Sequence, residues 1–179
     1  MPITLSRAFL TIIVPGLVLT APWMIILVIG ADLLQVVKDF PTLAHSILFS
    51  VVVVAGCICE GVATFLECRW DRALQRSGAF DVDGDWLAYL RAKDECIGVR
   101  YLSRLVTTLY FELCLLMAIP FLSVGLGLLI LLHAEDENGF WAAAVVVVGS
   151  LVALYLRYQA KSTHQLLCQT RQKLYGVGR

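Results

Sequence analysis

Charged side chains are absent from long stretches of this sequence. None lies between Ala8 and Ala31, and each of two further apolar runs contains a single acid, Glu60 or Glu112. A helix needs about 20 apolar residues to cross the hydrocarbon core of a bilayer. The hydrophobic content of 59% and the mean hydropathy of +0.80 exclude an ordinary soluble protein. We predict an all-α integral membrane protein, one four-helix domain over residues 1–179. Its transmembrane helices are expected at about 8–31, 43–66, 105–132 and 140–156.

Recognisable catalytic and cofactor motifs are also lacking. The sequence has no phosphate-binding glycine loop, HExxH, GxSxG or zinc-ribbon pattern. Alternating aspartates begin at Asp81, but Ala92 stands at the twelfth position, where a calcium loop needs glutamate. Most of the six cysteines lie in or beside apolar segments, so we read them as reduced thiols. Cys57 and Cys59 point about 200° apart on a helix, which argues against one metal centre that binds both. We expect no enzymatic activity, no cofactor and no metal.

The distribution of basic residues predicts the sidedness of the four helices. The net charge is zero, from 14 basic and 14 acidic side chains, so nothing favours nucleic acid as a partner. Seven Lys or Arg lie in the connection 67–104, five in the tail 157–179 and one before the first helix. The two opposite loops together hold only Lys38. The positive-inside rule therefore places both termini, the 67–104 loop and the tail in the cytoplasm of an inner-membrane protein.

The central connection should contain a short cytoplasmic helical excursion. Glu67 to Gln75 reads as a helical extension out of the bilayer, and an amphipathic helix is expected after Asp85. Aromatic and basic side chains here suit the headgroup zone or contact with a partner. They are Trp70, Trp86, Tyr89, Arg91 and Lys93.

Two polar stripes flank this connection. On each of two predicted helices, polar residues recur in steps of three and four, which places them on one face. The first stripe is Glu60, Thr64, Glu67 and Asp71, and the second is Arg100, Arg104, Thr108 and Glu112. An antiparallel hairpin would set Asp71 opposite Arg100 and Glu67 opposite Arg104 as structural ion pairs at the membrane edge.

At the deep end of the same hairpin, Glu60 would face Glu112. Two close carboxyl groups cannot both ionise easily, so at least one should keep a proton. With Thr64 and Thr108 they would form a buried polar centre or the lining of a pore. Three roles of Glu60 and Glu112 remain open. The protonated acids could only hold helices together, or they could form a proton or cation pathway. They could also take part in lipid chemistry at a metal site, although the sequence contains no complete set of metal ligands.

Two functions of different classes remain open. The first is a homo-oligomeric, pore-like or ion-permeable component centred on Glu60 and Glu112. The second is a non-conducting anchor or sensor that recruits a soluble cytoplasmic partner. Small four-span subunits of bacterial stress and antiphage systems share this architecture, which is an analogy of shape alone.

Overall fold

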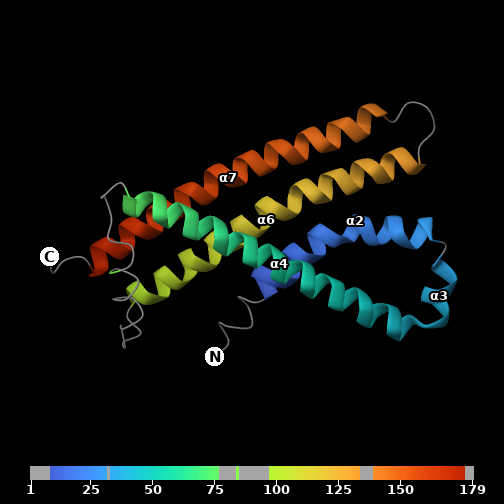
Figure 1. Ribbon diagram of the computed structural model, residues 1–179, viewed down its shortest axis with the longest axis horizontal. Coiled ribbons are helices and arrows are strands. Elements are labelled where there is room, and N and C mark those ends of the chain that lie inside the picture. Colours follow the sequence, from blue (N-terminus) through green and yellow to red (C-terminus); the bar gives the residue numbers. More distant parts are fainter. Residues whose placement is uncertain (1–8, 32, 77–83, 85–96, 134–138, 176–179) are drawn as a thin grey trace.

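The computed structural model describes residues 9–31, 33–76, 84, 97–133 and 139–175, and for residues 97–100, 133, 174 and 175 the backbone only. Throughout these ranges the regular elements are helices (Figure 1). Four of them are long and apolar enough to cross a membrane, at Phe9–Gly30, Pro41–Arg76, Tyr101–Leu132 and Gly139–Lys173. The predicted fold class, all-α with four apolar spanning helices, is confirmed.

The first span begins as a π-helical turn, η1 (Phe9–Ile13), which continues into α2 (Val14–Gly30). Pro15 lacks the N–H that would bind the carbonyl of Thr11, and the wider π turn lies at this point. Pro22 lies inside α2, and both prolines are buried. The short helix α3 (Leu34–Asp39) then connects α2 to α4.

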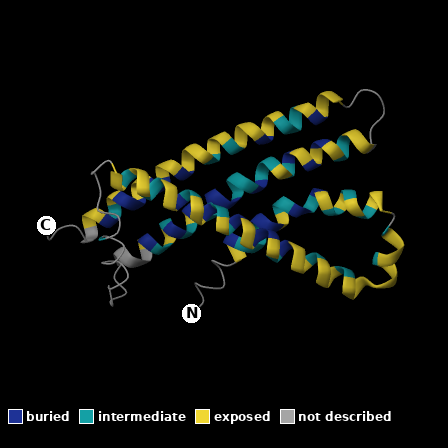
Figure 2. Cartoon of the chain, in the orientation of Figure 1, coloured by how far each residue is buried: buried dark blue, intermediate teal, exposed yellow. Residues whose placement is uncertain are grey.

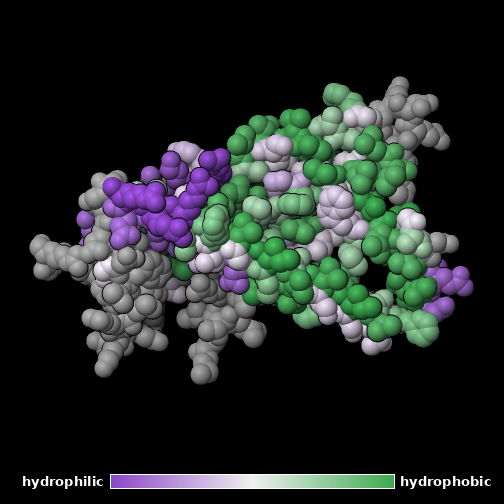
Figure 3. Space-filling model, viewed as in Figure 1, coloured by the Kyte–Doolittle hydropathy of each residue, from purple (hydrophilic) through white to green (hydrophobic). Residues whose placement is uncertain are grey.

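Three helices are much longer than a bilayer requires. They are α4 (Pro41–Arg76), α6 (Ile97–His133) and α7 (Gly139–Tyr175), with 36, 37 and 37 residues. At 1.5 Å per residue each is about 54 Å long, against about 30 Å for a hydrocarbon core. The extra length lies at one end, where hydrophilic residues of the visible face gather (Figure 3). We call this end the polar head: Glu67–Arg76 of α4, Ile97–Arg104 of α6 and Arg157–Tyr175 of α7.

Small residues let the N-terminal span approach α4 closely. A methyl group placed on Gly16 would lie 2.0 Å from the backbone oxygen of Val52, and one on Gly56 would lie 2.0 Å from that of Ile12. Only glycine permits such contact between helix backbones. Beyond this contact, α2 and α4 diverge toward α3 (Figure 1).

The core lies where α4 and α7 pack against α6. Buried residues face the helix contacts, while the outward sides of α4 and α7 are largely exposed (Figure 2). In a membrane protein these outward apolar faces contact lipid. The core is formed by small and branched apolar residues: Cys59, Ala63, Leu102, Val106, Leu109, Leu113, Cys114, Ala160 and Leu167.

Candidate functional site: a buried polar cluster

The two acids predicted to face each other, Glu60 and Glu112, lie in different environments. Glu112 is buried on α6, whereas Glu60 is half-buried on α4. The Thr163 hydroxyl of α7 hydrogen-bonds the Glu112 carboxyl group, and Glu112 Oε2 has no hydrogen-bond partner among the described residues. The group that Glu112 contacts therefore comes from α7.

The two threonines of the predicted centre lie on the surface. The Thr64 hydroxyl donates to the backbone oxygen of Glu60 at 2.9 Å, and Thr108 is exposed. A threonine that bonds to its own helix needs no partner from another helix.

The position of Glu112 along the bundle follows from its contact with Thr163. On α7, Arg157 and Lys161 are exposed and mark the end of the apolar length. Thr163 lies six residues beyond Arg157, or about 9 Å along the helix. Glu112 therefore lies toward the polar head rather than in the middle of the apolar length.

The hairpin between α4 and α6 has a different register from the predicted one. Glu67 is buried and accepts a hydrogen bond from Tyr110, which lies six residues beyond Arg104 on α6. Arg104 is exposed and forms no ion pair with Glu67. An exposed ion pair contributes at most about 1 kcal/mol to stability, so the absence of this pair costs the contact between α4 and α6 little.

Asp71 takes its partner from the tail helix. His164 Nε2 lies 2.7 Å from Asp71 Oδ1. The side chain of Arg100, the predicted partner of Asp71, lies outside the described residues. The ring of Trp70 packs edge-on against His164, with ring centroids 5.5 Å apart and an interplanar angle of 65°. Trp70 thus belongs to the interior contact, while Trp86, Tyr89, Arg91 and Lys93 lie outside the described residues.

These contacts form what we call the polar cluster. Helix α4 supplies two acids one turn apart, and α7 supplies a histidine, a cysteine and an arginine on one face. The members are Glu67, Asp71, His164, Cys168 and Arg171. Arg171 Nη2 donates to Cys168 Sγ at 3.4 Å. All but Asp71 are more than nine-tenths buried, and the Asp71 side chain is 17% exposed.

The burial of these ionisable groups requires mutual compensation. A lone charge buried in protein costs several kcal/mol, whereas acid and base together with hydrogen bonds offset that cost. Asp71 has His164, and the charge of Arg171 acts on Glu67. The cluster joins α4 to α7, and Tyr110 adds α6 through its bond to Glu67. Chemically, it offers a carboxylate, an imidazole and a thiol at one place.

The α7 half of this cluster was not predicted from the sequence, because residues 157–179 were interpreted as a cytoplasmic tail. A signal was present. Ala160, His164, Leu167 and Arg171 recur in steps of four, three and four, and all are buried, as expected for one packed helix face.

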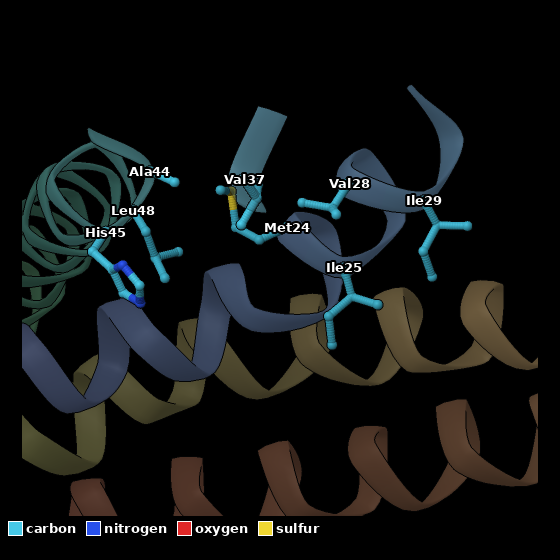
Figure 4. A pocket seen from close by; sticks show the side chains of 8 residues that line it. All are labelled: Met24, Ile25, Val28, Ile29, Val37, Ala44, His45 and Leu48. Atoms are coloured by element: carbon cyan, nitrogen blue, oxygen red, sulfur yellow. The ribbon is translucent and has the colours of Figure 1, made fainter. Parts of the chain in front are cut away.

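A second feature is an apolar cleft at the opposite end of the bundle. It has a volume of about 270 Å³ and lies between α2, α3 and α4 (Figure 4). His45 is its polar member, and its Nδ1 contacts the backbone oxygen of Pro41 at 2.5 Å. The lining residues are Met24, Ile25, Val28, Ile29, Val37, Ala44, His45 and Leu48.

Comparison of the chain with protein-family models, with curated proteins and with solved structures finds no match.

Proposed function

We propose that this protein is a non-conducting membrane anchor or sensor whose polar head recruits a soluble cytoplasmic partner. The observation that carries the proposal is the position of the buried ionisable groups. Glu67, Asp71, His164 and Arg171 tie helices together in the head, at the end of the apolar length. Such a network stiffens a projecting structure, and it does not line a path along the apolar length.

The dimensions of the head support a docking role. From Arg157 to Tyr175, α7 continues for 19 residues, or about 28 Å at 1.5 Å per residue. The end of α4 runs beside it (Figure 1). A helical projection of this size, held by buried contacts, offers a partner a fixed surface.

The charge of the head indicates the chemistry of the partner. Among the described side chains of the head the acids are buried or half-buried, so the exposed charges are basic. They are Arg69, Arg72, Arg76, Arg104, Arg157, Lys161 and Lys173. A basic surface attracts an acidic one and accelerates its association at low salt. We therefore expect a soluble partner with an acidic surface, on the side of the membrane that the positive-inside rule gives to the head.

The test is recovery of a soluble partner from native membranes. Wild-type protein should co-purify with a soluble protein that high salt releases, and Arg72→Glu with Arg76→Glu should reduce that recovery at least about tenfold. Lys38→Glu, an exposed charge reversal on α3 at the other end, is the matched control and should retain the partner. If the variant with Arg72→Glu and Arg76→Glu recovers as much partner as wild-type protein, the proposal is contradicted.

A pore-like homo-oligomer is the second candidate, and Glu60 is the observation that favours it. Glu60 is half-buried within the apolar length of α4, where a ring of acids in an oligomer would favour cations. In this case, expression should depolarise cells, and Glu60→Gln or Glu112→Gln should abolish the effect. An unchanged membrane potential during expression supports the anchor instead.

A further inference from the structure

We infer that Asp71, His164 and Cys168 form a binding site for a divalent transition metal of the zinc class. Their ligand atoms, one carboxylate oxygen, one imidazole nitrogen and one sulfur, all lie within 4.8 Å of one another. Imidazole and thiolate together favour zinc over magnesium or calcium, which prefer oxygen ligands. The inference goes beyond the anchor function and does not depend on it.

The helices place these ligands as a metal requires. His164 and Cys168 are four residues apart on α7, so their side chains lie on one face a turn apart. Asp71 reaches them from α4, 93 positions away from His164 in the sequence. Zinc binds nitrogen and oxygen at about 2.0 Å and sulfur at about 2.3 Å, so its ligands stand about 3.5 Å from one another. Small side-chain movements from the present separations would produce that spacing.

The surrounding charges suit a divalent ion. Asp71 as carboxylate and Cys168 as thiolate supply two negative charges, and His164 binds metal as the neutral imidazole. Glu67 and Arg171, of opposite charge, lie beside them. With a divalent ion bound, the ion and its three ligands carry no net charge, which lowers the electrostatic cost of burying the ion.

Neighbouring groups would orient two ligands and complete the coordination. Arg171 already donates to Cys168 Sγ at 3.4 Å, and Trp70 packs against the His164 ring. Glu67 Oε1 is buried and has no hydrogen-bond partner among the described residues. Glu67 lies one turn from Asp71 on the same face of α4, so a water as the fourth ligand would offer it a donor.

Titration with Co²⁺ tests this site, because cobalt replaces zinc and reports a thiolate ligand by a charge-transfer absorption band. The full-length protein in detergent, first treated with a chelator, should bind one Co²⁺ per chain with this band, and Zn²⁺ should remove the band. Cys168→Ser should abolish it, and Asp71→Asn and His164→Gln should weaken binding by about tenfold or more. Cys114→Ser is the matched control: Cys114 is equally buried, on α6, and its replacement should leave the band intact.

Two outcomes would overturn the inference: wild-type protein without the thiolate band, or a band that persists in Cys168→Ser. With either outcome, the cluster would only hold helices together through ion pairs and hydrogen bonds. Circular dichroism of each variant checks folding, and Asp71→Asn retains an oxygen acceptor for His164 if Cys168→Ser fails to fold. Recovery of the soluble partner is measured in a separate experiment with chelator present. The absorption band therefore tests the metal site, and partner recovery tests the anchor function.

Discussion

At the scale of single residues, the contact between Asp71 and His164 connects the end of α4 to the tail helix. His164 is 2% exposed and its Nε2 is 2.7 Å from Asp71 Oδ1. Removing one member of a buried pair leaves the other without compensation. Because Asp71 is 17% exposed, water relieves part of that cost, and we expect His164→Leu to lower the free energy of unfolding by about 2 kcal/mol.

Denaturant unfolding in mixed micelles, with chelator present to exclude a metal contribution, measures this effect. Lys161→Leu is the matched control, because Lys161 is exposed on the same helix and should change stability by less than about 0.5 kcal/mol. Equal loss in the two variants would mean that the buried pair adds nothing to stability.

The bond between Thr163 and Glu112 gives a second prediction at this scale. Thr163→Val removes the hydroxyl at nearly constant volume, so the buried Glu112 carboxyl group loses the hydrogen bond from Thr163. We expect a loss of about 1 kcal/mol in the free energy of unfolding, with recovery in Thr163→Ser, which keeps the hydroxyl. Thr64→Val is the comparison, because the exposed Thr64 hydroxyl bonds only to its own helix. A Thr64→Val loss as large as that of Thr163→Val would contradict this account.

At the scale of the elements, the contact between the first span and α4 depends on Gly56. A methyl group at Gly56 would lie 2.0 Å from the Ile12 backbone oxygen, whereas at Gly61 on the same helix nothing lies within 4 Å. Gly56→Ala should therefore destabilise the fold by about 2 kcal/mol through overpacking. Gly61→Ala should be neutral or slightly stabilising, because alanine favours helix over glycine. Thermal unfolding of both variants in detergent checks the contrast, and equal midpoints would contradict the close contact.

The helices themselves could be predicted from the sequence, but their mutual register could not. A run such as Leu105–Leu132 predicts a spanning helix from its length and composition alone. Pairing Glu67 with Arg104 rested on charge, which has little weight beside the packing of a helix interface. The predicted hairpin also considered two helices, while Asp71 of α4 contacts His164 on a third. The contacts between helices at the site are long-range in sequence. The spacing of buried residues on α7 indicates a packed helix face, but it does not specify which helix packs against that face.

At the scale of the whole molecule, the two ends of the bundle differ in kind. One end carries the polar head with its internal cluster, and the other carries α3 and an apolar cleft of about 270 Å³. The exposed basic residues of the head outnumber those near α3, where Lys38 is the basic side chain. This asymmetry is what orients a multi-span protein during insertion, so the head is expected in the cytoplasm.

Labelling of single cysteines by a membrane-impermeant maleimide tests that orientation. Lys38→Cys on α3 and Lys173→Cys on α7 replace exposed side chains, in a background where Cys57, Cys68 and Cys96 are serine and the buried cysteines are kept. In intact cells stripped of any outer membrane, Lys38→Cys should react at once and Lys173→Cys only after the bilayer is opened. The opposite pattern would place the head outside, and a soluble cytoplasmic partner could then not reach the basic surface of α4 and α7. The same pair of variants therefore tests the topology and a condition that the anchor function requires.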